Sequence, residues 1–290
     1  MLSLSLDHLV IAVRDLDLAS QNYQRLLGRK PSWAGHHPTY GTANVLFRID
    51  NCYIELLAPA EQSQDSAWNR ELIGRLDTVG EGLYAMALGT EDIQTSVQEI
   101  RQGGIHIEDA AAGDGVDEQT GARREWANAR MPVKETRGIP AFVIEHRSSP
   151  DALPVATSTS PAGTAVHAVD HVVVASSHMS ACLGLWHETF GLDLRLTLDR
   201  NGRSLHFLLM GQAILELVGE TEPAQPGEDD TFGGIAYRVK DVGATVERLR
   251  AAGVNISDAR DGNAPDTVVA DLKPGFSHDV RTLFIQKEVK

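Results

Sequence analysis

The stretch Leu6-Asp7-His8-Leu9-Val10-Ile11-Ala12-Val13 returns later in the chain as Val169-Asp170-His171-Val172-Val173-Val174-Ala175. Each copy is an apolar run, typical of a buried strand, with an Asp-His pair near its start. A helical pattern follows each copy and ends in Leu27-Gly28 or in Phe190-Gly191. Self-similarity at a fixed spacing of this kind indicates a duplicated module.

A second apolar strand, carrying one acidic residue, is repeated as well. It reads Cys52-Tyr53-Ile54-Glu55-Leu56-Leu57 in the first half and Ala213-Ile214-Leu215-Glu216-Leu217-Val218 in the second. The duplicated features therefore include one His and one Glu. These side chains can bind a metal ion or move a proton, so we expect them to mark the functional site.

The bulk composition narrows the classes of partner. The chain has 290 residues and a formal net charge of −14, so we expect no binding to nucleic acid or to an anionic membrane, because both would repel it. The two cysteines lie in apolar patterns, which predicts free buried thiols and a reducing compartment. With no signal-peptide pattern at the N-terminus and no apolar run long enough to span a bilayer, the expected location is cytoplasmic.

The order of elements predicts an α+β protein of two modules. In each, a strand and an amphipathic helix precede several strands, and this round occurs twice. Residues 148–165 are rich in Ser, Pro, Ala and Thr and poor in large apolar residues, so we expect a flexible linker there. The predicted modules are residues 1–147, which should carry the activity, and residues 166–290.

This pattern resembles the vicinal oxygen chelate superfamily, which includes glyoxalases, bleomycin-resistance proteins and extradiol dioxygenases. The matching motifs are Asp7-His8-Leu9-Val10-Ile11-Ala12-Val13, Tyr53-Ile54-Glu55-Leu56 and Ile235-Ala236-Tyr237-Arg238-Val239. The first half is similar to the glyoxalase-like domain subgroup through Gly35-His36-His37-Pro38 and Arg124-Glu125-Trp126. The resemblance implies two glyoxalase-type modules, each made of paired βαβββ units curled around a cavity.

The resemblance also implies metal ligands on the first, fourth, fifth and eighth strands of a module. Carried over to the first module, these positions are His8, Glu55, Leu83 and Glu145, of which Leu83 cannot bind a metal. The implied cofactor is a divalent metal ion such as Fe, Mn, Ni or Zn, held by His8, Glu55 and Glu145. Glu55 and Glu145 are the candidate catalytic residues, with Glu145 as a possible general base.

The second module offers a weaker, alternative site. The same positions fall on His171, Glu216, Gly234 and Gln286, and His206 could replace the missing ligand if the turn at Gly211-Gln212 is regular. Two carboxylates attract a hard cation more strongly than one. We therefore expect the principal site in the first module.

Further residues of the first module are candidates for substrate contact. The His36-His37-Pro38 segment reads as a loop that could place His37 at the cavity mouth, and Arg124 and Trp126 lie on one predicted strand. An Arg can hold a carboxylate and a Trp can stack on a ring, although salt-bridge and core roles compete with these functions. Similarly, His8 and Glu55 could form a metal-free acid/base pair or a purely structural pair.

Two functions remain open. The first is an enzyme acting on a small oxygen-rich molecule by metal-assisted lyase, isomerase or dioxygenase chemistry, as the resemblance implies. The second is a metal-free binding protein that sequesters a small molecule without turnover. In both cases the expected partner is a small molecule, and the chain is expected to be a monomer or a homodimer.

Overall fold

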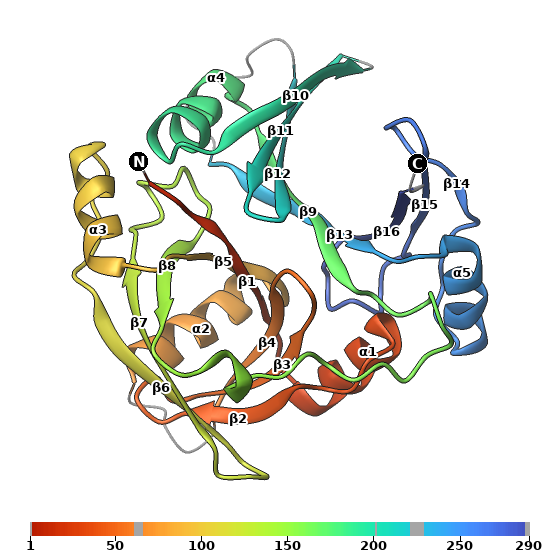
Figure 1. Ribbon diagram of the computed structural model, residues 1–290, viewed down its shortest axis with the longest axis horizontal. Helices are drawn as coiled ribbons and strands as arrows, with labels where there is room; N and C mark the ends of the chain where they lie inside the picture. The colour runs from red at the N-terminus through yellow and green to blue at the C-terminus, as the bar shows by residue number, and fades with distance from the viewer. Residues whose placement is uncertain (1, 61–65, 201, 221–228, 288–290) are drawn as a thin grey trace.

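The chain folds into two curved β-sheets with helices packed against them (Figure 1). The computed structural model describes residues 2–60, 66–200, 202–220 and 229–287. The predicted α+β architecture and the two similar modules are thus confirmed, and helices form the minor part of each.

The first sheet is a closed barrel of eight strands in the order β1-β4-β3-β2-β6-β7-β8-β5. Its strands are β1 (Ser5–Ala12), β2 (Trp33–His37), β3 (Thr42–Arg48), β4 (Tyr53–Pro59), β5 (Gly82–Gly89), β6 (Ala111–Asp117), β7 (Arg123–Arg130) and β8 (Ala141–His146). The helices of this half are α1 (Leu16–Leu27), α2 (Ala67–Thr78) and α3 (Ile93–Gln102).

The second sheet has eight strands in the corresponding order β10-β11-β12-β9-β13-β16-β15-β14, but it stays open. Its strands are β9 (Ala168–Ser176), β10 (Asp193–Arg200), β11 (Arg203–Met210), β12 (Ala213–Glu220), β13 (Thr231–Arg238), β14 (Arg260–Asp261), β15 (Thr267–Asp271) and β16 (Thr282–Lys287). Its helices are α4 (Met179–Leu183), which continues as a π-helical stretch over Gly184–Thr189, and α5 (Val242–Ala251).

Local sequence signals explain the helix positions. Asp15, Asp92 and Asp241 each accept a hydrogen bond from a first-turn amide of α1, α3 and α5, respectively. These side chains satisfy amides that have no partner inside the helix. The predicted helices over these segments are confirmed. Helix α2 and strands β2, β6, β10, β14 and β15 were not predicted as regular elements.

The duplicated motif occupies the same place in both sheets. Strand β1 lies parallel to β4 and antiparallel to β5, and β9 lies parallel to β12 and antiparallel to β13. Alternate residues of a strand point to opposite faces, so one set of side chains from the central strands faces the inside of the curved sheet. The other set packs against helices such as α1 and α3, whereas α2 packs against inward-facing side chains of β1 and β4.

Closure of the first barrel depends on a short contact between β2 and β6, where Gly35 pairs with Asp117 and His36 with Val116. A side chain at Gly35 would overlap the carbonyl oxygen of Val116. Only a residue without Cβ lets the two backbones approach this closely. The second sheet has no pairing between its edge strands β10 and β14.

The two sheets share one apolar core. A single cluster of buried side chains includes Tyr23 of α1, Met86 of β5, Trp186 of the π-helical stretch and Tyr237 of β13. Polar contacts also join the halves, and the Arg137 guanidinium pairs with the buried carboxylate of Asp230. None of the helices in the described ranges combines the length and apolarity that a membrane span requires.

The connection at 148–165 corrects the expectation of a free linker. The backbone amide of Ala156 donates to Arg48, and that of Thr159 donates to Gly28. Leu153 is buried against Trp33, Leu46 and Tyr53 at one end of the barrel. One well-placed Leu and a series of backbone hydrogen bonds suffice to dock the segment. The boundaries themselves, and separate folding of the two halves, stay predictions.

We predict that Gly35→Ala destabilises the protein by about 1–3 kcal/mol, because the added methyl group forces the β2–β6 contact apart. The control is Gly74→Ala in α2, where an added Cβ would meet no atom. That change should stabilise the protein by up to about 1 kcal/mol, because Ala favours a helix over Gly. Chemical denaturation measures both, and equal effects of the two substitutions would contradict the closure argument.

Candidate functional site

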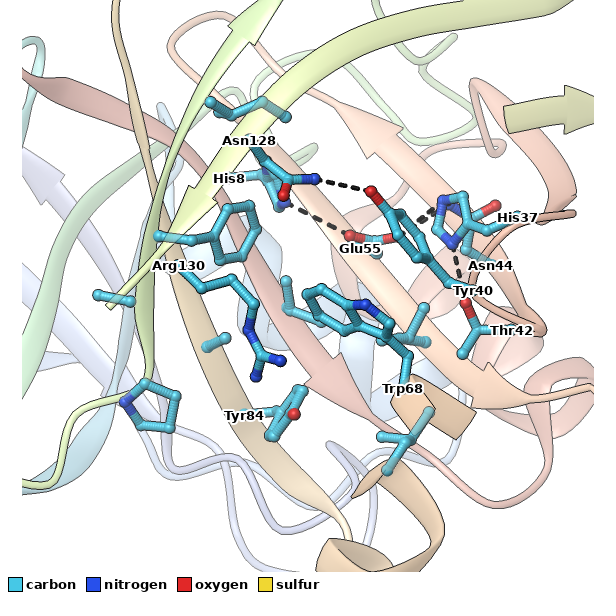
Figure 2. A pocket seen from close by; sticks show the side chains of 18 of the residues that line it. His8, His37, Tyr40, Thr42, Asn44, Glu55, Trp68, Tyr84, Asn128 and Arg130 are labelled. Atoms are coloured by element: carbon cyan, nitrogen blue, oxygen red, sulfur yellow. Dashed lines mark hydrogen bonds and ion pairs between the residues drawn. The ribbon is translucent and has the colours of Figure 1, made fainter. Parts of the chain in front are cut away.

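The barrel of the first module encloses a cavity of ≈ 100 Å³ between its strands. Polar groups are concentrated in one part, where His8, His37, Asn44 and Glu55 lie close together (Figure 2). Trp68 of α2, Tyr84 and Arg130 line another part. The cavity therefore joins a hydrogen-bonded polar cluster to an aromatic, cationic wall.

His8 is held between two carboxylates. Its Nδ1 lies 2.6 Å from Asp7 Oδ1, and its Nε2 lies 3.4 Å from Glu55 Oε2. Its ring also stacks on Tyr53, with centroids 4.3 Å apart, and meets the edge of Phe142. These contacts fix the imidazole in one orientation, with only 3% of the residue exposed.

The charges of neighbouring side chains determine the protonation of His8 and Glu55. Burial by itself would lower the pKa of His8, but the hydrogen bonds and charges of Asp7 and Glu55 raise it above 6.5. Burial would likewise raise the pKa of Glu55, whereas His8, His37 and the Asn44 amide lower it to about 2. An opposite charge at this distance favours the ionised form of each group. Near neutral pH, Glu55 is thus a carboxylate, and Asp7 and Glu55 shift His8 towards the imidazolium form.

His37 extends the cluster through Asn44. The Asn44 amide nitrogen donates to Glu55 Oε1 at 2.8 Å and lies 3.0 Å from His37 Nε2, while His37 Nδ1 lies 2.9 Å from the Thr42 hydroxyl. Burial lowers the pKa of His37, which favours a neutral ring accepting from Asn44. The Asn44 Oδ1 atom is buried and has no hydrogen-bond partner among the described residues. A buried acceptor without a partner is costly, so it favours a ligand with a donor.

Arg124 contributes a buried positive charge without an acidic partner in the described part of the chain. Its guanidinium lies over the rings of Trp33 and Tyr53, 5.6 and 5.5 Å from their centroids. Ring faces stabilise a cation only in part. Arg130, in contrast, is paired with Glu71 and lies 3.9 Å from the Trp68 centroid.

Glu145 does not join this cluster, which corrects the predicted ligand set. Its Oε2 accepts from the amide of Ile93 at the start of α3, and its Oε1 lies 3.0 Å from Arg147. The neighbouring residue Ile144 faces the cavity instead. Since side chains alternate along a strand, Glu145 points to the outer surface.

The corresponding residue of the second module behaves in the same way. Gln286 accepts from the amide of Val242 at the start of α5, while Ile285 faces the inside of the second sheet. The eighth-strand prediction is therefore wrong in both modules for one reason. These two side chains cap helices rather than facing the cavities.

Two other positions considered for a metal ligand, His206 and Leu83, do not supply one either. His206 binds Thr197 and Ser204, whereas its neighbour Phe207 lines the concave face of the second sheet beside Glu216, so His206 cannot replace a ligand there. Leu83 belongs to the apolar core, and the β5 residue opposite His8 is Ala87. Neither residue could complete a metal site.

The second module repeats the central pair with different partners. His171 Nε2 lies 3.1 Å from Glu216, and His171 Nδ1 lies 3.0 Å from Asp170. Asp170 is also bound by Arg238 and Lys287, whereas Asp7 is bound at the corresponding place by His146. Burial raises the pKa of Glu216, the opposite of the shift in Glu55.

The donor set does not fit the divalent ion that the resemblance implies. The three predicted ligands do not meet, because Glu145 lies outside the cavity. Among the residues with described positions, no group of three or more His, Cys, Asp and Glu side chains is arranged to hold a metal ion. No chemical step can be derived through a metal from this arrangement.

Other cavity residues escaped the sequence analysis. Asn44 and Tyr53 follow the inward alternation of β3 and β4, so strand parity relative to Glu55 could have identified them. Trp68 lies on the unpredicted helix α2 and carried no usable signal. His37, Arg124 and Trp126, which were predicted, do line the cavity. His37 lies on β2, however, and not in a loop.

Comparison with known families matches this architecture. A family model described as glyoxalase-like domain matches residues 6–190, and one described as the glyoxalase/bleomycin resistance protein/dioxygenase superfamily matches residues 168–268. The first match runs past the predicted linker into the second module. A search of the curated proteins found no matching sequence.

Solved structures share the fold over nearly the whole chain. A hypothetical protein from Staphylococcus aureus is 16% identical, with a TM-score of 0.62 and coverage of 97% of this chain and 98% of the other. A mutant of 4-hydroxymandelate synthase from Streptomyces coelicolor is 14% identical, with a TM-score of 0.66 and coverage of 99% and 94%. A halotolerant catechol dioxygenase is 14% identical, with a TM-score of 0.62 and coverage of 100% and 88%. At these identities the likeness concerns the fold.

We predict that Glu55→Gln lowers the pKa of His8, because it removes the anion beside Nε2. In the unchanged protein, the neighbouring carboxylates raise the pKa of His8, so the charged His8 ring stabilises the fold. This His8 contribution is fully present below pH 6.5, the ordinary pKa of His, and is lost as the pH rises through the pKa of the folded state. The Glu55 contribution is present above pH 4.5 and is lost as the pH falls towards about 2. Nuclear magnetic resonance titration of the His8 ring nitrogens measures the change.

The matched control is Glu145→Gln. It places in the first module the residue that already caps α5 in the second, and it leaves the cavity untouched. The His8 titration should therefore stay as it is in the unchanged protein. A shift with Glu145→Gln but none with Glu55→Gln would contradict the geometry described above.

Proposed function

Because the chain belongs to the glyoxalase-like domain family, whose model matches residues 6–190, we propose that the first barrel is the reaction site of an enzyme acting on a small oxygen-rich acid. The proposed chemistry is proton transfer of the lyase or isomerase kind. It uses Glu55 and His8 and follows from the residues present without a metal step. The observation that carries the proposal is the imidazole of His8, buried between two carboxylates inside a cavity.

The substrate class is inferred from two polar groups of the cavity that could each take up a complementary ligand group. The buried guanidinium of Arg124 lacks an acid among the described residues, so a ligand carboxylate would neutralise it. Asn44 Oδ1 accepts no hydrogen bond from the residues whose positions are described, so a ligand hydroxyl would satisfy it. The rings of Tyr40, Trp68 and Trp126 suit a flat apolar body. We therefore propose an aromatic or other planar hydroxy or oxo acid.

The proposed roles are those of a general base and a general acid. Glu55 accepts a proton from a carbon or hydroxyl of the substrate, and the His8 imidazolium donates a hydrogen bond or a proton to the oxygen that gains negative charge. Asp7 keeps His8 oriented and charged through Nδ1. The low pKa of Glu55 makes it a weak base while it is paired with His8. A substrate oxygen that takes the His8 hydrogen bond would weaken that pairing and strengthen the base.

One observation favours the second candidate, a binding protein without turnover. Both Glu55 oxygens already have partners, and a pKa of about 2 leaves little tendency to accept a proton. In that case Arg124, Asn44 and the rings would hold the same ligand class without a reaction. Binding and turnover therefore have to be measured separately.

The experiment uses a panel of aromatic 2-hydroxy and 2-oxo acids in deuterated water. Proton nuclear magnetic resonance follows the exchange of carbon-bound hydrogen for deuterium, which reports proton transfer even when no net product accumulates. We expect exchange with at least one panel member. Glu55→Gln should slow it by roughly 10²- to 10⁴-fold, the usual contribution of a general base.

Two variants separate the outcomes. Arg124→Gln should weaken binding of the acid, whereas Glu145→Gln should leave both binding and exchange unchanged. Binding that depends on Arg124 without any exchange would establish the sequestering protein instead. Binding indifferent to Arg124, with exchange equal in Glu55→Gln and the unchanged protein, would reject this site.

A further inference from the structure

The concave face of the second sheet forms a larger and more open cavity, of ≈ 530 Å³. It stays accessible because β10 and β14 do not pair, so the sheet does not close as the first one does. Gly233 and Gly234 of β13 lie on its floor, beside Val173 and close to Arg281. An added Cβ would overlap Val173 at Gly233 and the carbonyl oxygen of Arg281 at Gly234, so glycine lets these segments pack closely. His171 and Glu216 line the same cavity.

Apolar side chains that are partly exposed to solvent line this cavity. Leu196 of β10 is 46% exposed, and Phe207, Ile214 and Leu283 are partly exposed on the same face. The apolar area lost from water on binding is a major source of affinity. A concave sheet face of this kind favours a ligand with an apolar body.

The cationic side chains around this face indicate that the ligand also carries an anionic group. Five cationic side chains and three carboxylates line the cavity, although the chain as a whole has a net charge of −14. Arg195, Arg260 and Lys287 are paired with carboxylates. Arg203 and Arg281 have no acidic partner within the described ranges, so their guanidinium groups are available to an anion.

We propose that the concave face of the second sheet is a second ligand site, which binds a small amphipathic organic anion. The apolar body lies on Leu196, Phe207 and Ile214, and the anionic group is held by Arg203 or Arg281. Asp170 does not compete for these arginines, because Arg238 and Lys287 already bind it. The proposal concerns a different cavity from the first barrel and does not rest on the function proposed for it.

The test uses two fluorescent probes with the same ring system. 1-Anilinonaphthalene-8-sulfonate carries an anionic group, and N-phenyl-1-naphthylamine does not. The full chain should bind the sulfonate more tightly than the neutral probe, and added salt should reduce this preference. The double variant Arg203→Gln with Arg281→Gln should weaken sulfonate binding by about three- to tenfold, as expected for partly exposed ion pairs, and leave the neutral probe unchanged.

Further variants locate the site. Ile214→Trp should weaken both probes because it fills the apolar wall, while Arg147→Gln, outside both cavities, should weaken neither. Thermal unfolding checks that each variant is folded, and the charge variants test the proposal even if Ile214→Trp does not fold. Sulfonate binding abolished by Arg124→Gln and unaffected by the double variant would assign the probe to the first barrel and overturn the proposal.

Two other results would also overturn it. Equal, salt-independent affinity for the two probes would show that no anion is recognised. Sedimentation showing a dimer that the double variant dissociates, with no effect on probe binding, would make this face a contact between two copies of the chain.

Discussion

The buried imidazole of His8, held between Asp7 and Glu55, is the constraint on which the first module depends. His8 and Glu55 are buried inside the barrel, where each charge would be costly alone, and the partly buried Asp7 contacts the other side of the His8 ring. Together they favour a charged His between two carboxylates, and Asn44 links them to His37. The barrel must close to keep water out of this cluster, and closure in turn requires Gly35, whose backbone contacts β6.

The two modules share the same strand arrangement, but differences at a few positions give them different charge contacts and different cavities. Asp7 and Asp170 both orient a His, but the first is bound by His146 and the second by Arg238 and Lys287. The first sheet is closed around an aromatic cavity, while the second is open and lined by arginines. One ancestral frame can thus present two chemically distinct concave surfaces within a single chain.

The main strands and helices could be predicted from the sequence because their signals are local. Apolar runs indicate strands, and Asp15, Asp92 and Asp241 cap helices within four residues. The site could be predicted only in part. Glu145 and Gln286 lie one residue beyond the cavity-facing position, and a shift of one residue reverses the face of a strand. His37 was assigned to a loop because β2 exists through pairing with β3 and β6, which no local pattern of residues encodes.

Leu153 gives the connecting segment a second role, because it covers the end of the barrel formed by Trp33, Leu46 and Tyr53. A peptide that joins two modules is ordinarily free to vary in length and composition. Here a deletion, or recombination with a different partner module, would uncover the barrel end as well as alter the spacing. The first module therefore depends on the connecting segment for part of its packing, so an exchange of modules would have to preserve this segment as well.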